Sequence, residues 1–277
     1  MNIIGLGRPG CQIAQKFEKH DQYSVICIDT ENAGYGTFLP IEVQNSHEDY
    51  EKNYKSLNLG LLRGETTLIL SGAGQISGCA LRLLEELQSA SVSIIYIKAD
   101  ESLLSGPSAT RDKIVFGVMQ NYARSNKIKV IYAVSNKNIE SIIGDVSIMN
   151  YWDEINNVIS STYHMINVFE NTEPLLKNSP ASRQTSKIGT FGVVNFDTQN
   201  EKLFYDLKFP RSKNYFYGVN RETLEGDKRV LHKIRSFIES KNDDKCQSGF
   251  SIYSTDYDNN YVYSLQLASY IQEENSE

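Results

Sequence analysis

The stretch "IIGLGRPGCQIAQKF", from Ile3 to Phe17, joins a short apolar run to a glycine-rich turn and then to residues that can open a helix. Gly5, Gly7 and Gly10 have the spacing G-x-G-x-x-G, which in dinucleotide-binding domains follows a strand and brings backbone amides close to a phosphate. Asp29 ends the next strand-like run, where an acidic residue could bind a ribose. Taken alone, the stretch predicts either a Rossmann-type site for NAD or FAD or a tight turn of the kind that any parallel α/β protein needs.

A second glycine loop follows two strands later, in "LILSGAGQISGCALRLLEEL". Here too an apolar run leads into small residues and then into an amphipathic helix, so backbone amides and a helix amino terminus again face an anion. A dinucleotide has no need of this loop, whereas a di- or triphosphate held from two sides would use both loops. The pair of loops favours a nucleotide other than NAD or FAD. The alternative is that both are tight turns whose small residues serve only packing.

The order of strand-like and helix-like runs predicts an α/β fold. β-branched runs alternate with helix-like segments through residues 1–148, which predicts a Rossmann-like, mainly parallel sheet with helices on both faces. Residues 149–176 have apolar residues at helical spacing and predict one long central helix. The polar residues 177–187 predict a linker, and residues 188–277 predict a smaller α+β domain. In that domain "GFSIYSTD" and "YVYSLQLASY" predict half-exposed antiparallel strands joined by the turn "DYDNN".

Composition and charge argue against several classes of partner. The chain carries 28 Lys and Arg against 34 Asp and Glu, a formal net charge of -6, with no basic block, so we expect no direct binding of nucleic acid. The 4 cysteines and 4 histidines lack ligand spacing, which predicts no metal held by them. No apolar run approaches the roughly 20 residues of a membrane span and no leader precedes the first strand, so we expect an untargeted cytoplasmic protein. The excess of Asn, Ser, Ile, Lys and Tyr is typical of an AT-rich genome and indicates a viral or low-GC source.

Both loops resemble those of the tubulin and FtsZ superfamily. "GRPGCQIAQKF" is similar to the opening loop and helix of tubulins, where glycines and a Gln-Ile pair recur, and "SGAGQISG" resembles the superfamily's phosphate signature of three glycines, Thr, Gly, Ser or Thr, and Gly. Ser71 and Ala73 replace glycines, and Gln75 with Ile76 replaces the usual Thr and Gly. The resemblance implies GTP or GDP as the ligand, bound with or without Mg²⁺. The residues implied to hold it are Gly5, Gly7, Gly10, Cys11 and Gln12 in the first loop, and Gly72, Ala73, Gly74, Gln75, Ile76 and Ser77 in the second.

The predicted central helix carries the residues implied to bind guanine. In the superfamily an aromatic side chain covers the base and an Asn or Asp four residues later binds its edge; "WDEINNVI" offers Trp152 and Asn156 at that spacing, on one helical face. An Asn amide both donates and accepts, as the guanine edge requires. Without the two loops, the pair would be interpreted as a core aromatic with a polar neighbour. The usual Glu of the sugar loop is not recognisable in "DESLLSGPSATRDKIVFG", and Arg111 is the implied ribose or phosphate contact.

Hydrolysis in the superfamily is completed by a loop of the next subunit in a filament, and the matching stretch here is incomplete. "VVNFDTQN", from Val193 to Asn200, resembles a pattern of Asn, any residue, Asp, two more residues and Asp. Asn195 and Asp197 match the pattern. Asn200 stands where the second carboxylate belongs, and an amide can neither act as a general base nor carry the charge that holds a cation. The polar segment between Asp29 and Leu68 also lacks the usual Gly/Ala-rich loop that senses the terminal phosphate.

The resemblance therefore implies a divergent, phage-encoded tubulin/FtsZ-like protein that binds GTP or GDP and self-associates head to tail into filaments, with weak or absent hydrolysis. Two alternatives stay open. Asn200 and the altered upstream segment favour a structural or interaction protein that keeps the fold without nucleotide turnover. A Rossmann-type NAD or FAD enzyme rests on the first loop and Asp29 alone.

Overall fold

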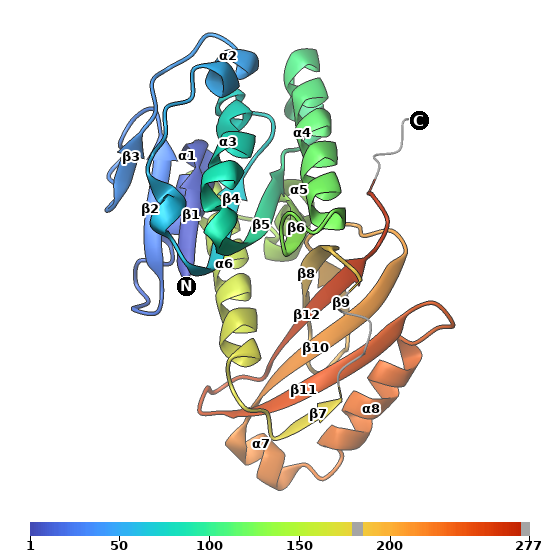
Figure 1. Cartoon of the computed structure of the whole chain (residues 1–277). Helices are drawn as coiled ribbons and strands as arrows, with labels where there is room; N and C mark the ends of the chain where they lie inside the picture. Colours follow the sequence, from blue (N-terminus) through green and yellow to red (C-terminus); the bar gives the residue numbers. More distant parts are fainter. Residues whose placement is uncertain (179–184, 273–277) are drawn as a thin grey trace. The chain divides into compact units, whose positions relative to one another are not determined.

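The structure, a computed structural model, describes residues 1–178 and 185–272 (Figure 1). The predicted linker, residues 177–187, therefore lies largely outside the described residues. The described chain forms two compact units, residues 1–160 (unit 1) and residues 161–272 (unit 2). The division falls within the helix α6 (Tyr151–Glu170).

Unit 1 is built on a parallel sheet in the order β3-β2-β1-β4-β5-β6, as the sequence predicted. Its strands are β1 (Asn2–Leu6), β2 (Ser24–Asp29), β3 (Phe38–Pro40), β4 (Gly64–Leu70), β5 (Ala90–Lys98) and β6 (Val130–Ser135). Its helices are α1 (Gly7–Gln15), α2 (His47–Lys52), α3 (Ala80–Glu86), α4 (Gly106–Arg124), α5 (Asn136–Ile143) and the first part of α6, with short 3₁₀ helices η1 (Leu59–Leu61), η2 (Gln75–Cys79), η3 (Leu87–Ser89) and η4 (Glu101–Leu103).

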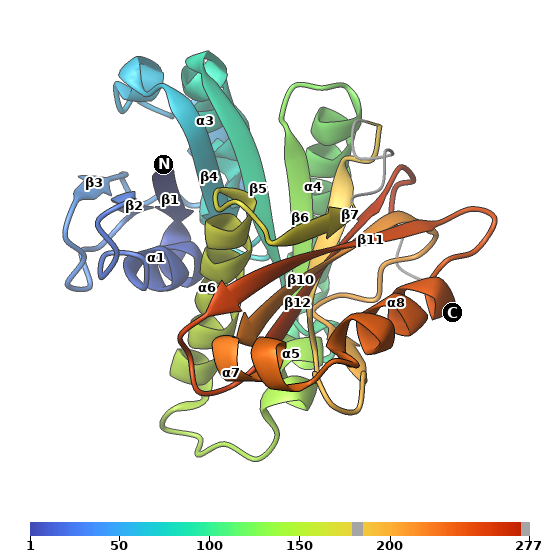
Figure 2. The same ribbon diagram turned by 90° about the horizontal axis from the view of Figure 1, so that it is seen from below.

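The direction in which the chain winds fixes where a ligand can enter unit 1. From β1 the chain moves to β2 and β3 at one edge, and it then returns to β4 and continues through β5 to β6 in the opposite direction. Because such crossovers are right-handed, α1 lies on one face of the sheet and α3 and α4 on the other, as Figure 2 shows. The loops after β1 and β4 therefore diverge between two adjacent strands. Such a switch point is where open parallel sheets bind their ligands.

Burial on both faces explains why the strands of unit 1 are continuous apolar runs. Ile4 of β1, Ile69 of β4 and Ile95 of β5 are each 0% exposed. A strand that is covered on both sides has no solvent-facing positions to fill with polar residues, so it does not alternate. The observed bounds of β1 are those of the predicted run "NIIGL".

Unit 2 has a mixed sheet in the order β8-β12-β10-β11-β7, with β9 paired to β8. Its strands are β7 (Leu176–Asn178), β8 (Ile188–Val194), β9 (Glu201–Leu203), β10 (Pro210–Asn220), β11 (Gln247–Thr255) and β12 (Tyr261–Ala268), and its helices are α7 (Arg221–Gly226), α8 (Val230–Ser240) and the last part of α6. Strands β10 and β11 run parallel, while β12 is antiparallel to both β10 and β8. This is the α+β composition expected for the carboxyl-terminal part of the chain.

The predicted hairpin of β11 and β12 is wrong. The turn at residues 256–260 does join them, but β10 lies between the two strands and pairs with both. The strands are also buried rather than half exposed, because each face of the sheet is covered. Phe250 and Ile252 belong to the cluster around α8, and Tyr253 stacks on Phe169 of α6 with ring centroids 4.5 Å apart.

The central helix is shorter than the predicted residues 149–176. It begins at Tyr151 and ends at Glu170. Polar side chains just beyond its end donate hydrogen bonds to carbonyl oxygens of the last turn. Asn171 Nδ2 donates to Asn167 O at 2.9 Å and Thr172 Oγ1 donates to Val168 O at 2.8 Å. Leu176 to Asn178 then form β7, which pairs with β11. Short polar residues compete with the helix in this way wherever they can bond to the local backbone.

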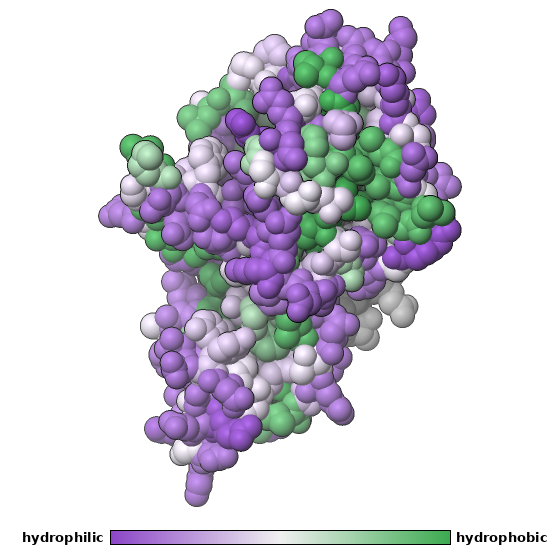
Figure 3. All heavy atoms as spheres, turned by 90° about the vertical axis from the view of Figure 1, so that its left-hand side faces the viewer, coloured by the Kyte–Doolittle hydropathy of each residue, from purple (hydrophilic) through white to green (hydrophobic). Residues whose placement is uncertain are grey.

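The surface of the molecule is mostly hydrophilic on the face drawn in Figure 3, with the most continuous group of hydrophobic residues at the right and smaller groups elsewhere. Among the described residues, no helix combines the length and the apolar composition that crossing a bilayer requires.

Candidate functional site

A cavity of about 470 Å³ lies in unit 1 at the switch point between β1 and β4. Its volume is in the range of small-molecule sites, roughly 300–1,000 Å³. Both glycine loops, the ends of β5 and β6, and α6 contribute to its wall. The lining residues are Leu6, Gly7, Arg8, Pro9, Gln12, Ile13, Ser71, Ala73, Gly74, Ile76, Ile97, Ala99, Asn136, Trp152 and Asn156.

The two glycine loops meet at Gly7. This residue has a positive φ of 68°, and a side chain there would begin 2.8 Å from Ile76 Cγ2 of the second loop. Glycine adopts this backbone conformation without the steric cost that other residues pay. Gln12 and Ile13, the pair that carries the resemblance to tubulins, also line the cavity. One ligand can therefore contact both loops.

Other members of the first glycine motif serve packing rather than the cavity wall. A Cβ on Gly10 would lie 2.2 Å from the carbonyl oxygen of Ile69, and a Cβ on Gly5 would lie 2.6 Å from Cys11. Cys11 is fully buried, and its thiol donates to Gly5 O at 3.4 Å. The glycines thus let α1 pack directly against the backbone of the sheet.

The second loop divides in the same way. Ala73, Gly74 and Ile76 line the cavity, as does Ser71, which precedes them. Three further residues predicted to bind the nucleotide do not line the cavity: Gly72, Gln75 and Ser77. Ser77 Oγ donates to Gly72 O at 3.1 Å and to Gly74 O at 2.7 Å, so it closes the loop on itself.

Gln75 connects the second loop to the polar segment that precedes α2. Its Nε2 donates to Asn45 O at 3.3 Å, and a Cβ on Gly78 would lie 1.9 Å from the carbonyl oxygen of His47. The segment that lacks the Gly/Ala-rich loop of the superfamily therefore packs on the second glycine loop. Its carbonyl oxygens face that loop at both contacts.

The first turns of α6 place Trp152 and Asn156 side by side in the cavity wall. Trp152 is 56% exposed, whereas Asn156 is 7% exposed. Within the described residues the Asn156 side chain makes no hydrogen bond, and its amide is not among the buried unpaired polar atoms, so the amide keeps some contact with solvent. Lys16, the residue after α1, pairs with Asp153, and Tyr151 OH donates to Glu140 of α5 at 3.1 Å. These contacts fix the start of α6 against its neighbours.

Arg8 and Asn136 are two polar lining residues that sequence reasoning did not assign to the site. Arg8 is exposed and, across residues 1–178 and 185–272, forms no ion pair. A cation inside a glycine fingerprint was the available signal. Asn136 comes directly after β6, and its position in the wall depends on the sheet order, which the sequence does not give.

The electrostatics of the cavity suit an anion. All its lining residues are described, and among them Arg8 alone carries a charge. Asp29 is not in the wall: it accepts a hydrogen bond from its neighbour Thr30 N at 2.8 Å. Burial raises the pKa of Asp29, against the lowering effect of the Thr30 amide and of Arg8. The acidic partner required by a Rossmann-type site does not face this cavity.

The wall does not provide a Mg²⁺ site of its own. Mg²⁺ in nucleotide sites is commonly held by one or two carboxylates together with phosphate oxygens. The cavity offers amide and hydroxyl oxygens, with no carboxylate among its lining residues. In the part of the chain that the structure describes, no three His, Cys, Asp or Glu side chains gather in a geometry that could hold a metal. The residues present therefore do not fit the ion.

Arg111 does not line the cavity. It lies on α4, where its guanidinium donates to Ser108 Oγ at 3.4 Å, and its Nε is buried without a hydrogen-bond partner. It is close enough to His47 for its charge to act there: burial, and then the charge of Arg111, lower the pKa of His47. The predicted sugar or phosphate contact is thus found beside α2.

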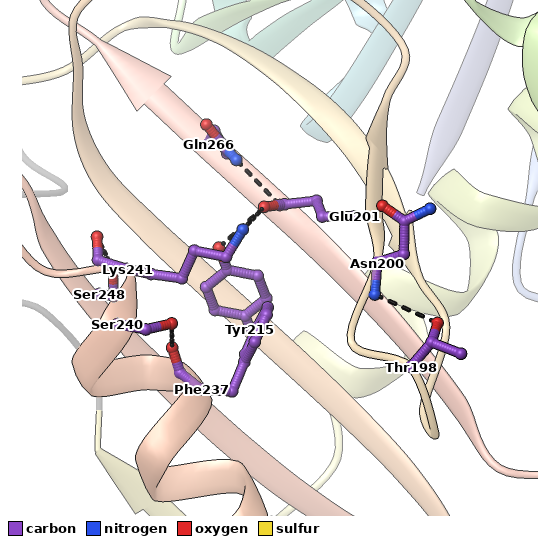
Figure 4. Close-up of polar contacts among 9 residues, drawn as sticks. All are labelled: Thr198, Asn200, Glu201, Tyr215, Phe237, Ser240, Lys241, Ser248 and Gln266. Carbon is purple, nitrogen blue, oxygen red and sulfur yellow. Dashed lines mark hydrogen bonds and ion pairs between the residues drawn. The ribbon is translucent and has the colours of Figure 1, made fainter.

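The candidate catalytic residues form a short loop of unit 2 between β8 and β9. Asn195 Oδ1 accepts hydrogen bonds from the backbone amides of Asp197, at 3.0 Å, and Thr198, at 2.8 Å. The side chain of Asn195 is therefore committed to the shape of the loop. Asp197 is exposed, and so is Asn200, whose backbone amide donates to Thr198 Oγ1 at 3.4 Å (Figure 4).

Glu201 follows Asn200 directly but does not replace the missing carboxylate. Figure 4 shows it turned toward Lys241, Tyr215 and Gln266, away from the loop. Its carboxylate accepts from Lys241 Nζ at 2.9 Å, Gln266 Nε2 at 2.9 Å and Tyr215 OH at 3.2 Å. Burial alone would raise the pKa of Glu201, but Lys241 and the other donors outweigh it, so the net shift is downward. This carboxylate is a buried structural anion.

The sequence matches no protein-family model and no curated protein. The structure, however, is similar to several solved structures. TubZ of Bacillus thuringiensis serovar israelensis, in GDP-form protofilaments, has a TM-score of 0.70 at 14% identity, over 96% of this chain and 86% of that one. FtsZ of M. jannaschii, an empty dimer, has a TM-score of 0.69 at 10% identity, over 96% and 87%.

CetZ2 from Haloferax volcanii, in a GTPγS-bound protofilament, has a TM-score of 0.67 at 11% identity, over 96% of this chain and 92% of that one. The fold predicted from the two glycine loops and the central helix is confirmed: the chain has the fold of the tubulin/FtsZ superfamily.

Proposed function

We propose that the protein binds GTP or GDP in the cavity of unit 1, self-associates head to tail into filaments, and hydrolyses GTP slowly or not at all. One observation carries the proposal. Two glycine loops far apart in the sequence touch at Gly7 and Ile76, and they share one cavity wall with Trp152 and Asn156.

The phosphates would lie against the glycine loops. The amino terminus of α1 begins at Gly7 with no side-chain cap, so its first backbone amides remain available to an acceptor. The helix dipole favours a negative charge at this end. Arg8, exposed and lining the cavity, adds the full positive charge that the wall otherwise lacks. Together these features support an anionic ligand.

The base would lie against α6. The indole of Trp152 offers an exposed aromatic face, and base stacking on an aromatic contributes about 1–3 kcal/mol. Asn156 lies one turn further on, and its amide has both a donor and an acceptor for the edge of guanine. Within the described residues this amide makes no hydrogen bond, so its donor and acceptor groups are available to a polar ligand.

Self-association is supported by two observations. The similar TubZ and CetZ2 structures are described as protofilaments. In this chain, Ile148 and Met149 precede α6 and are each 91% exposed, and an apolar pair of this kind is stabilised when a partner covers it.

Slow or absent hydrolysis is supported by the loop from Asn195 to Asn200. Asp197 is the carboxylate that this loop offers, because Asn195 is used in the turn and Asn200 is an amide. Glu201 is held by Lys241, Gln266 and Tyr215. A neighbouring subunit that presented this loop to the phosphates would bring one carboxylate where the superfamily pattern has two.

Replacing both base-binding residues, Trp152→Ala with Asn156→Ala, tests the site. We expect about a hundredfold loss of affinity for GTP, the sum of a lost stacking contact and a lost hydrogen bond. Equilibrium dialysis with labelled GTP, with ATP, NAD and FAD as competitors, measures it. The matched control is Asn157→Ala, which removes a neighbouring amide of α6 that binds Asp153 and does not line the cavity. Unchanged affinity in the double variant would overturn the proposed site, and a preference for NAD or FAD would favour a Rossmann-type enzyme.

The second candidate function is a structural protein that keeps this fold without turnover. The cavity wall without a carboxylate and the amide at Asn200 favour it. Light scattering and phosphate release with added GTP separate the two. Scattering that depends on GTP, with little phosphate release, supports the nucleotide-bound filament. Scattering that is independent of GTP supports the structural protein.

A further inference from the structure

We propose that a buried triad of Tyr96, Lys98 and Asp112 is a positioning device that holds Gly72, and with it the second glycine loop, in the shape that receives a phosphate. That the ligand is a nucleotide phosphate rests on the proposed function. The positioning of the loop does not, because it is a property of the protein without ligand.

The triad joins the carboxyl end of β5 to α4. Lys98 Nζ lies 2.6 Å from Asp112 Oδ2, and Tyr96 OH donates to Asp112 Oδ1 at 2.8 Å. Tyr96 is 0% exposed, Asp112 1% and Lys98 4%. The Tyr96 ring packs on Phe116 of α4 with centroids 4.8 Å apart, and Lys98 Nζ lies 5.0 Å from the centre of the same ring. A buried carboxylate with two donors of this quality has a well-defined position.

The triad packs directly against Gly72 of the second glycine loop. A Cβ on Gly72 would lie 1.9 Å from Tyr96 OH and 3.0 Å from Asp112 Oδ1. Any side chain at position 72 would therefore have to displace the triad. Ser77 holds the opposite side of the loop through its bond to Gly72 O. Gly72 is thus fixed between the triad and Ser77, while Ala73 and Gly74 face the cavity.

The triad acts through the loop and does not touch the ligand. Side chains alternate along a strand, and Ile97 and Ala99 line the cavity. Tyr96 and Lys98 therefore point to the other face of the sheet, toward α4. Lys98 has a second effect there. It neutralises Asp112, whose unpaired carboxylate, next to Gly72, would otherwise repel an approaching phosphate.

Hydrogen exchange of the ligand-free protein tests the positioning. Tyr96→Phe removes one hydroxyl and keeps the ring contact with Phe116. We expect the amides of residues 72–78 to exchange about tenfold faster in this variant, with the rest of unit 1 unchanged, because one buried hydrogen bond is lost. Tyr122→Phe is the control, since it removes the hydroxyl of a tyrosine of α4 whose ring faces Lys127. Unchanged exchange at residues 72–78, or equal acceleration throughout unit 1, would overturn the proposal.

A pair of compensating substitutions, one that adds a methyl group and one that removes a hydroxyl, gives a second test that does not depend on nucleotide. Gly72→Ala alone should lower thermal stability, because its methyl group meets Tyr96 OH. Adding Tyr96→Phe removes that oxygen, so the double variant should be more stable than Gly72→Ala alone. Additive losses would contradict direct contact between the triad and the loop.

Affinity measurements separate this proposal from the proposed function. In Tyr96→Phe we expect weaker binding of GTP and unchanged binding of guanosine, which has no phosphate. Equal losses for both would mean that the triad supports unit 1 in general and would overturn its role at the loop. A wild-type protein that binds neither ligand would refute the proposed function, and the exchange data would still decide the triad.

Discussion

The cavity loops of unit 1 and the Asn195–Asn200 loop of unit 2 differ in what determines their residues. In the cavity loops, glycines are fixed by close approach to the backbone, as at Gly10 against the Ile69 carbonyl. The Asn195–Asn200 loop is exposed, and its shape comes from hydrogen bonds of the Asn195 side chain to its own turn. Few packing contacts constrain Asp197 or Asn200.

The difference shows which residues report on chemistry. Gly5, Gly10 and Gly72 would be required by packing even in a protein that had lost its ligand, so their presence says more about the fold than about binding. Arg8 and Asn156 have no such packing reason and are stronger indications of a ligand. In the exposed loop, Asn200 could be an aspartate at no steric cost, so packing does not account for its amide.

The largest effect, on the free energy of unfolding, is expected from a substitution that disrupts the packing of the first glycine motif. Gly10→Ala places a methyl group 2.2 Å from the Ile69 carbonyl oxygen, and neither backbone can move without separating α1 from the sheet. We expect a loss of about 3 kcal/mol in the free energy of unfolding. Urea denaturation without nucleotide measures it.

Gly117→Ala is the matched control, because a Cβ there meets nothing within 4 Å and the residue lies inside α4. It should raise the free energy of unfolding by about 0.5–1 kcal/mol. If Gly10→Ala were as stable as the wild type, the first glycine motif would not be a packing feature, and the contrast between the two regions would fail.

A smaller effect, on binding alone, is expected at Arg8. Arg8→Gln removes the charge from the cavity wall, and we expect about a tenfold loss of affinity for GTP, the lower end of what a charge-assisted hydrogen bond contributes. Binding of guanosine and thermal stability should not change. Titration calorimetry with both ligands measures this. The control is Lys19→Gln, an exposed cation that does not line the cavity. An equal loss in both variants would mean that the effect is only one of net charge.

The smallest effect is expected when the second carboxylate is restored. Asn200→Asp should raise GTP hydrolysis a few-fold, well below the roughly 100-fold that a well-positioned general base can give, since the cavity wall itself holds no carboxylate. Phosphate release above the concentration at which scattering appears measures it. Combining Asn200→Asp with Asp197→Asn should return the rate to the wild-type level. An unchanged rate in Asn200→Asp, in protein that still assembles, would show that more than this carboxylate is missing.

The sequence alone gave the class of fold, the strands of unit 1 and the loops that meet at the cavity, because these depend on local patterns. Continuous apolar runs predict buried parallel strands, and small residues between a strand and a helix predict a loop that can receive an anion. Trp152 and Asn156 could be paired because helical spacing places them on one face.

Strand pairing and side-chain contacts between residues distant in the sequence were decided only by the tertiary structure. The insertion of β10 between β11 and β12 is a pairing choice that no local pattern records. The tertiary contacts also separated the glycines that face the cavity from those that pack, and they showed Arg8 in the wall, Arg111 beside His47, and Glu201 bound by Lys241 rather than available to the loop. A residue type sets what a side chain can do, whereas burial and the distances to its partners determine whether it is free to do it.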